Sequence, residues 1–167
     1  VDHLPAHPVN VYTHLTEVSP TPFACFYKND HHYLLCASPE RFLQKKGDQL
    51  ISQPIKGTIK RNLENDADDT LQLQTLQNSS KDKSENVMVV DLVRNDLSRI
   101  CKQGSVEVSE LFGIYSYPQV HQMISTITGE LDEEIHFVDA IKNAYPMGSM
   151  TGAPKNRAME LIEQFEK

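Results

Sequence analysis

A lysine between two structure-breaking residues is the first candidate for chemistry. Lys56 lies in SQPIKGTIKR (52–61), two residues after a proline and directly before Gly57. A lysine amine is a nucleophile only when neutral, and an ordinary lysine, with a pKa of about 10.4, is almost wholly protonated at neutral pH. Burial and neighbouring cations lower such a pKa, and Lys60 and Arg61 are cations that the turn could bring close. The alternative is a surface lysine in a hairpin turn.

A carboxyl group is expected beside this lysine. Glu40 directly precedes a predicted hairpin of residues 41–46 and 49–54, and Lys56 follows it. Because the two ends of a hairpin lie side by side, Glu40 and Lys56 are predicted to form an acid and nucleophile pair at one end of a sheet. A surface ion pair, for instance between Glu40 and Arg41, explains the same spacing equally well.

Two further groups of residues are candidates for binding. Asp82 and Glu85 share one face at the start of a predicted helix, where they could bind Mg²⁺ or complement the helix dipole. Glu163 and Glu166 form a second pair of this kind, for which we expect only a solvated helix face. The segment GSMTGAPK (148–155) combines glycines, hydroxyl side chains and a helix N-terminus, which are the components of an anion site.

The hydrophobic pattern predicts the elements that position these residues. Val89, Val93 and Leu97 have the spacing of a buried helical stripe, in a helix with Ser84 as its N-cap. The predicted helices are 9–18, 62–77, 84–100, 137–145 and one that opens at Pro154, and the predicted strands are 22–29, 31–38, 41–46, 49–54, 104–112 and 118–131. Antiparallel strands interspersed with helices, without regular βαβ alternation, indicate an α+β fold.

Composition and charge argue against several classes of protein. The 167 residues suit one domain, and the net charge of −7 argues against a nucleic-acid binder. No run approaches the ~20 apolar residues of a membrane span, and the first residues do not resemble a signal peptide. Cys25, Cys36 and Cys101 lack metal or redox spacing, so we expect reduced thiols, with Cys25 and Cys36 buried. The prediction is a cytoplasmic protein without nucleic-acid or membrane partners.

Four sequence blocks stand in order along the chain. They are SPERF, PIKGT, ENVMVVDLVRNDLSRI followed by GSVEVSELF, and YPMGSMTGAPKNRAME. Together they closely resemble the chorismate-utilising enzymes, the family of anthranilate synthase, aminodeoxychorismate synthase and isochorismate synthase. The resemblance implies an anthranilate synthase component I-like chorismate-binding domain, in which antiparallel β-sheets pack together and are flanked by helices. Residues 1–167 would be part of a single such catalytic domain, with its N- and C-terminal portions missing.

The resemblance also implies roles for individual residues. Glu40 corresponds to the general acid that protonates the departing 4-hydroxyl of chorismate. Gly57 and Thr58 correspond to substrate contacts. Glu85 corresponds to a ligand of the Mg²⁺ that engages the ring carboxylate, and Asp82, one turn earlier, to an outer or water-mediated partner. The implied substrate is therefore chorismate, and the implied cofactor is Mg²⁺.

Lys56 and Gln122 indicate one branch of this family. Anthranilate synthases typically have Ala at the place of Lys56 and His at the place of Gln122, where the His is associated with the elimination of pyruvate. A lysine in PIKGT resembles aminodeoxychorismate synthase component I, whose amine attacks C2 of chorismate. We therefore expect conversion of chorismate and ammonia, supplied by a glutaminase (glutamine amidotransferase) subunit, to 4-amino-4-deoxychorismate in para-aminobenzoate and folate biosynthesis. The alternatives are an anthranilate synthase, and a fragment that is inactive by itself.

Overall fold

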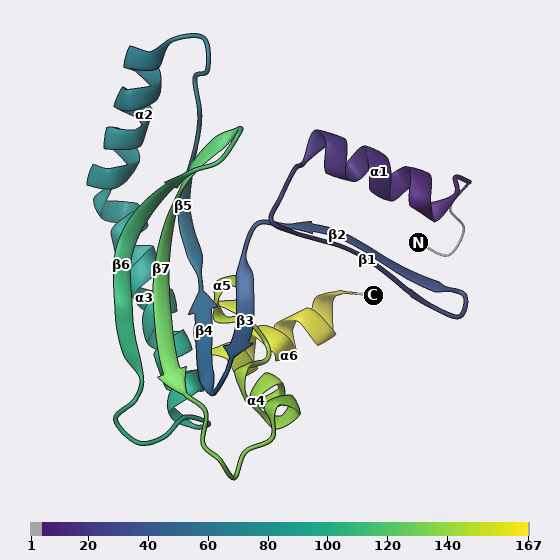
Figure 1. Cartoon of the computed structure of the whole chain (residues 1–167), viewed down its shortest axis with the longest axis vertical. Coiled ribbons are helices and arrows are strands. Elements are labelled where there is room, and N and C mark those ends of the chain that lie inside the picture. Colours follow the sequence, from purple (N-terminus) through teal and green to yellow (C-terminus); the bar gives the residue numbers. More distant parts are fainter. Residues whose placement is uncertain (1–4, 167) are drawn as a thin grey trace. The chain divides into compact units, whose positions relative to one another are not determined.

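The predicted helices and strands form in the predicted order along the chain, with two elements that were not predicted, a strand at residues 55–60 and a short helix at residues 148–151 (Figure 1). A computed structural model describes residues 5–166, in an N-terminal unit that ends at Arg41 and a C-terminal unit that begins at Phe42. The helices are α1 (Pro8–Val18), α2 (Asp66–Asn78), α3 (Ser80–Ser98), α4 (Phe137–Ala144), α5 (Gly148–Thr151) and α6 (Lys155–Phe165). The strands are β1 (Phe23–Asn29), β2 (His32–Ser38), β3 (Arg41–Lys46), β4 (Gln49–Gln53), β5 (Ile55–Lys60), β6 (Glu107–Ser116) and β7 (Val120–Glu130).

The N-terminal unit is a hairpin with one helix on it. Strands β1 and β2 pair antiparallel along their whole length, and α1 packs on them through Tyr12, whose ring centroid lies 5.5 Å from that of Phe26. Successive strand residues face opposite sides, so Cys25 points away from α1. Cys25 is exposed and its cross-strand partner Cys36 is partly exposed, whereas Cys101 of the other unit is buried. The predicted burial of Cys25 and Cys36 was therefore wrong.

Strand β7 organises the sheet of the C-terminal unit. It pairs with β6 along one side, and with β4 and then β5 along the other, while β3 continues the sheet beyond β4. Pro54 separates β4 from β5 because a proline has no N–H to donate to a β-ladder. Its carbonyl still accepts a hydrogen bond from the Ser125 amide at 3.2 Å, so the two strands lie in succession along β7.

Helices α2 and α3 pack on one face of this sheet, and α3 runs behind it in the view of Figure 1. The predicted stripe of α3 is buried, with Val89 and Leu97 at most 1% exposed. The hydrophobic core around it contains Leu50, Val89, Val90, Val93, Leu97, Ile100, Cys101, Ile127, Leu131 and Ala140. The N-cap is Ser79, whose Oγ accepts a hydrogen bond from the Asp82 amide, so the predicted cap at Ser84 was wrong and the helix begins earlier.

The C-terminal helix begins as predicted, directly after Pro154, but its apolar stripe is uncovered. Leu161 and Ile162 are 36% and 41% exposed, and Phe165 is 72% exposed. Glu163 and Glu166 are exposed, in agreement with the predicted solvated face. None of the helices formed by residues 5–166 is long and apolar enough to cross a membrane.

Candidate active site

Lys56 lies near the start of β5 rather than in a hairpin turn. The β5–β7 register shifts between Ile55 and Thr58, which is the irregularity expected of a β-bulge around Lys56 and Gly57. The partly buried Lys56 Nζ donates a hydrogen bond of 3.0 Å to the Ser149 carbonyl oxygen of α5. The structure thus joins the PIKGT block to the GSMTGAPK block, 93 residues further along the chain.

Arg61 does not provide the cation that was predicted beside Lys56. Strand β5 is extended, so five residues separate these two positions by about 16 Å. The Arg61 guanidinium instead binds the Asp69 carboxylate of α2 at 2.7 Å, and His121 Nε2 lies 3.1 Å from the same carboxylate. The hydrogen bond from Arg61 lowers the pKa of Asp69 to about 2, although burial opposes it. This cluster anchors α2 to the end of β5.

Gly57 brings the start of α3 close to the strand that carries Lys56. Its φ of +98° lies in a region that favours glycine. A Cβ at this position would lie 3.0 Å from Asp82 Cβ and 3.0 Å from Leu76 Cδ1, so only a glycine lets the strand and Asp82 approach so closely. Two of the predicted site residues, Gly57 and Asp82, are therefore neighbours.

Thr58 and Gln122 are partners across β5 and β7. Ser125 of β7 donates a hydrogen bond to Asn86 of α3, so strand alternation places Gln122 on the opposite face of the sheet from α3. Thr58 is exposed, whereas Gln122 is only 6% exposed. The Gln122 Oε1 is buried and has no hydrogen-bond donor among residues 5–166. Its neighbour His121 lies on the other face, against Asp69, as strand alternation predicts. Buried amide oxygens without a donor are rare in folded proteins, so the Gln122 oxygen is a candidate acceptor for a ligand.

A buried polar network fixes α3 to the sheet, and the sequence analysis missed it. Asn86 is fully buried, and its Oδ1 accepts a hydrogen bond of 2.5 Å from the Ser125 hydroxyl of β7. The same hydroxyl oxygen accepts a hydrogen bond from the Phe112 amide of β6. The signal was available, because Asn86 lies three residues before Val89 on the apolar stripe of α3. A polar residue on such a stripe indicates a buried partner.

The two carboxylates predicted to bind Mg²⁺ lie one turn apart at the N-terminal end of α3. Glu85 Oε1 lies 3.9 Å from the Lys81 ammonium, and the Glu85 side chain is 45% exposed. Residues 5–166 contain no cluster of three His, Cys, Asp or Glu side chains able to hold a metal ion. Two oxygen donors on one helical face fit part of a Mg²⁺ shell, since this ion usually keeps several waters.

The pairing of Glu40 with Lys56 stays a prediction. Glu40 lies in the turn between β2 and β3, at the end of the N-terminal unit, while Lys56 belongs to the C-terminal unit. Within its own turn, the Glu40 amide donates a hydrogen bond of 3.3 Å to the Ser38 hydroxyl oxygen. The hairpin of β3 and β4 forms as predicted, and its turn lies between Lys46 and Gln49.

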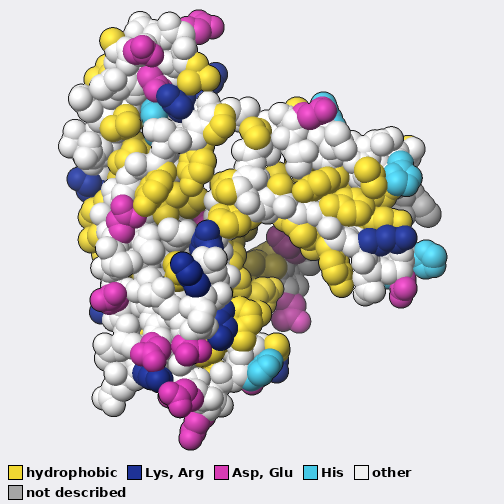
Figure 2. All heavy atoms as spheres, in the orientation of Figure 1, with side chains coloured by type: hydrophobic (Ala, Val, Ile, Leu, Met, Phe, Trp, Pro, Cys, Tyr) yellow, Lys and Arg dark blue, Asp and Glu magenta, His cyan; other side chains and the backbone are white. Residues whose placement is uncertain are grey.

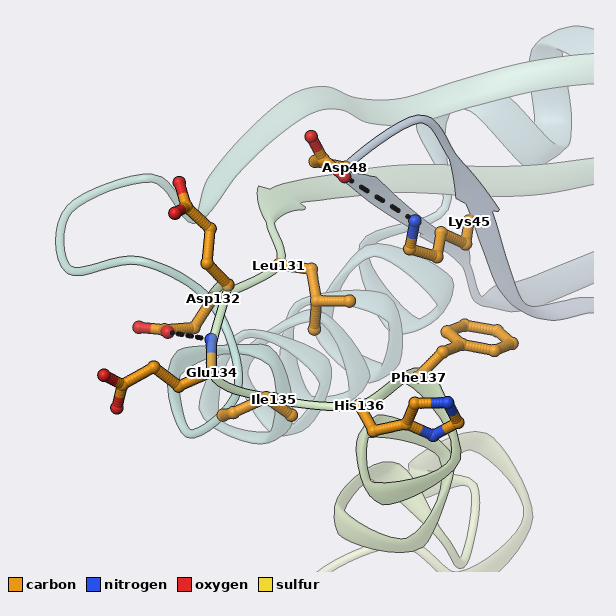
Figure 3. Close-up of a pocket in the computed structure, with 9 residues that line it drawn as sticks. Lys45, Asp48, Leu131, Asp132, Glu134, Ile135, His136 and Phe137 are labelled. Atoms are coloured by element: carbon orange, nitrogen blue, oxygen red, sulfur yellow. Dashed lines mark hydrogen bonds and ion pairs between the residues drawn. The ribbon is translucent and has the colours of Figure 1, made fainter.

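The sheet also carries a pocket of about 710 Å³ near the end of β7, shown in Figure 3. Its lining includes Lys45, Asp48 and the segment 131–137, and Figure 2 shows acidic side chains gathered at this end of the sheet. In β-strands, the eight residues from Met123, opposite the Lys56 bulge, to Leu131 span about 26 Å. The pocket is therefore remote from Lys56, and it contains none of the predicted site residues.

Comparison with known proteins identifies the family. A family model described as chorismate binding enzyme matches residues 2–167. The chain belongs to this family. The match spans both units of the structure. Within the C-terminal unit the three blocks contact one another, because Lys56 binds the Ser149 carbonyl and the adjacent Gly148 packs on Leu92.

Relatives and a solved structure agree with this assignment. Aminodeoxychorismate synthase component 1 of Klebsiella aerogenes is 44% identical over 155 residues, which are 93% of this chain and 34% of the relative. The protein of that name from Bacillus subtilis is 40% identical over 163 residues, 98% of this chain and 34% of the relative. Anthranilate synthase component I from Streptococcus pneumoniae has a TM-score of 0.81 and 30% identity, over 98% of this chain and 35% of that chain.

These comparisons confirm the predicted anthranilate synthase component I-like fold, with antiparallel strands and flanking helices. The chorismate-binding chain spans about a third of the length of these curated relatives. Its description as part of a single catalytic domain stays a prediction. The predicted cytoplasmic location also stays a prediction, since the relatives include both bacterial proteins and a chloroplastic synthase from Arabidopsis thaliana.

Proposed function

We propose that the whole protein containing this chain is an aminodeoxychorismate synthase component 1, which converts chorismate and ammonia to 4-amino-4-deoxychorismate. The observation that carries the proposal is the convergence of three sequence blocks on Lys56. Its amine binds the Ser149 carbonyl of the GSMTGAPK segment, and the adjacent Gly148 packs on Leu92 of the ENVMVVDLVRNDLSRI block. Relatives with this name are 40% and 44% identical to the chain.

The proposed reaction consists of two displacements. The neutral Lys56 amine attacks C2 of chorismate, both ring double bonds shift by one position, and the C4 hydroxyl leaves as water with a proton from the Glu40 carboxyl group. Ammonia then attacks C4, both ring double bonds shift back, and the Lys56 amine leaves C2. The new C4 ammonium returns a proton to Glu40, so the enzyme is regenerated. An activated amine and a nearby acid are both needed, which is why Glu40 is assigned to this site.

Other residues would bind and orient the substrate. We propose that Gly57 and Thr58 contact chorismate, since both lie beside Lys56 on β5. Asp82 and Glu85 would hold Mg²⁺, directly or through water, and the bound ion would neutralise the ring carboxylate. The buried Gln122 oxygen lies across from Thr58 and would accept a hydrogen bond from the substrate or from ammonia. An amide is not a base, which favours a product that keeps its enolpyruvyl group.

The proposal includes a partner that supplies ammonia. The relatives are named component 1, which implies a second component for those proteins. We propose that the partner is a glutaminase subunit, and that the product enters para-aminobenzoate and folate biosynthesis.

A covalent adduct on Lys56 tests the proposal directly. The full-length protein is incubated with chorismate and Mg²⁺ without ammonia, and its peptides are mapped by mass spectrometry. We expect an adduct on Lys56, and loss of both adduct and ammonia-dependent activity in Lys56→Ala. Lys60→Ala is the matched control, because Lys60 is exposed on the same strand and should be dispensable. A Lys56→Ala enzyme with full activity and no adduct in the wild type would overturn the proposal.

The second candidate is an anthranilate synthase, favoured by the similarity to the solved Streptococcus pneumoniae structure. The two activities differ in their products. Anthranilate is fluorescent and is released together with pyruvate, whereas 4-amino-4-deoxychorismate keeps the enolpyruvyl group. Release of anthranilate by the full-length protein would establish the second candidate instead.

A further inference from the structure

A buried ion pair lies behind the segment that binds the Lys56 amine. Lys155, the first residue of α6, pairs its Nζ with Asp96 Oδ2 of α3. The two side chains are only 15% and 10% exposed. Burial raises the pKa of Asp96, and the hydrogen bond from Lys155 acts in the opposite direction. Two charges withdrawn from water in this way require a close partner, so each holds the other in place.

The same ammonium group closes a loop. Lys155 Nζ also lies 3.4 Å from the carbonyl oxygen of Ala144, the last residue of α4. A carbonyl at a helix C-terminus attracts a cation because it has no partner within the helix. Residues 145–154 connect α4 to α6, so Lys155 ties the two ends of this ten-residue segment together and fastens them to α3 through Asp96.

The middle of the loop is fastened to the same helix. A Cβ on Gly148 would lie 3.0 Å from Leu92 Cβ, so the loop backbone packs directly on Leu92. Leu92 and Asp96 are four residues apart on α3 and therefore share one face. The loop is thus held at its ends by Asp96 and at its middle by Leu92, and the next residue, Ser149, provides the carbonyl oxygen that binds Lys56.

We infer that the Asp96–Lys155 pair is a positioning device for Lys56, acting through the 145–154 loop and the Ser149 carbonyl. The carbonyl accepts one N–H of the Lys56 amine at 3.0 Å. A neutral amine has two N–H bonds and one lone pair. Because one N–H points at the Ser149 carbonyl, the lone pair must point in another direction, away from Ser149. Orientation of a reacting atom contributes strongly to rate, and a displacement of about 1 Å can cost about 10²-fold. The catalytic consequence rests on the proposed function, whereas the effect on the free Lys56 amine does not.

The exposed pair of Arg157 and Glu160 provides a matched control on the same helix. Its charged atoms lie 2.8 Å apart, but both side chains are more than 60% exposed. The test compares Asp96→Asn, Lys155→Met and the double variant with Arg157→Gln in the full-length protein. The double variant removes both buried charges, which is often tolerated, so it tests the inference even if a single variant fails to fold.

The first measurement needs no substrate. Lys56 and Lys60 are labelled with limiting acetic anhydride, and the ratio of their acetylation is read by mass spectrometry. We expect the ratio of Lys56 acetylation to Lys60 acetylation to change at least about threefold in the double variant, because the Lys56 amine is released from the Ser149 carbonyl. Arg157→Gln should leave the ratio at the wild-type value. An unchanged ratio in a folded double variant would overturn the inference.

The second measurement follows the rate of the Lys56 adduct with chorismate in single turnover. We expect the maximal rate of adduct formation to fall about 10- to 100-fold in the double variant. The chorismate concentration that gives half of this maximal rate should change little. A merely structural pair would not separate the two parameters in this way, and wild-type rates in the double variant would overturn the inference. If the wild type itself forms no adduct, the proposed function fails, and the labelling ratio still decides the inference.

Discussion

Gly57→Ala tests the close approach of β5 to α3, on which the geometry around Lys56 depends. The substitution has two costs that the structure separates. An alanine at φ +98° is in a sparsely populated region, which costs about 1–3 kcal/mol. Its Cβ would also lie 3.0 Å from atoms of Asp82 and Leu76, and overpacking of this kind costs typically about 1–3 kcal/mol. We therefore expect Gly57→Ala to lower the free energy of unfolding by about 2–6 kcal/mol.

Gly47→Ala is the control that has the conformational cost without the steric cost. Gly47 has a φ of +61° in the β3–β4 turn, and nothing lies within 4 Å of a Cβ built there. That variant has only the conformational cost, about 1–2 kcal/mol. Leu76→Ala in the Gly57→Ala background removes one of the two close contacts. It should therefore cost less there than in the wild type, with a coupling energy of about 0.5–3 kcal/mol.

Urea unfolding of the full-length protein, followed by circular dichroism, provides the measurement. Gly57→Ala should have a lower midpoint than Gly47→Ala, and its ammonia-dependent activity should fall because Asp82 is displaced. Equal midpoints for the two variants, or additive effects of Gly57→Ala and Leu76→Ala, would refute the argument from close approach.

Three further predictions concern polar groups of the C-terminal unit. Ser125→Ala leaves the buried Asn86 Oδ1 without its donor and should cost about 1–3 kcal/mol by urea unfolding, whereas an unchanged midpoint would contradict the network. The ionised Asp69 stabilises the fold fully above its unfolded pKa of about 3.9, and this contribution is lost as the pH falls through its folded pKa of about 2. The difference in melting temperature between wild type and Asp69→Asn should therefore be largest above about pH 4 and shrink below it, and a difference that grows toward acid would be contrary to the prediction. Gln122→Met removes a buried oxygen without a donor, so it should raise the melting temperature without substrate while lowering kcat/KM at least about tenfold; wild-type kcat/KM would show that no ligand uses this oxygen.

Local elements were predictable because their signals are contained in short stretches of sequence. The β3–β4 hairpin was found from two β-rich runs around Gly47, and α3 from the spacing of Val89, Val93 and Leu97. The bounds were less accurate, since α3 begins at Ser80 and the cap at Ser79 was missed. Candidate caps at residues 79 and 84 are both serines, and the sequence alone does not decide which of them begins the helix.

Contacts between distant segments were not predictable in the same way. Neither the PIKGT block nor the GSMTGAPK segment indicates by itself that Lys56 binds the Ser149 carbonyl. The sequence also does not indicate that the residues before and after Pro54 form two successive strands that both pair with β7. The predicted Arg61 neighbour was wrong because a strand, not a turn, follows Lys56. Polar residues such as Asn86 and Asp96 among the buried positions of α3 could be recognised from the sequence, but their partners could not. Such pairings depend on the whole fold.

The central position of β7 has a consequence for synthesis of the chain. Three strands among residues 5–166, β4, β5 and β6, pair with β7, which is synthesised after all of them. The partner of Ser52 is Ile127, 75 residues later, and a ribosome that adds about 5–20 residues per second needs about 4–15 s to reach it. During that interval the edges of β4 and β5 that later pair with β7 have no partner, and such edges are a template for association with other chains. Nascent chains of this protein are therefore expected to depend on chaperone cover until β7 has emerged.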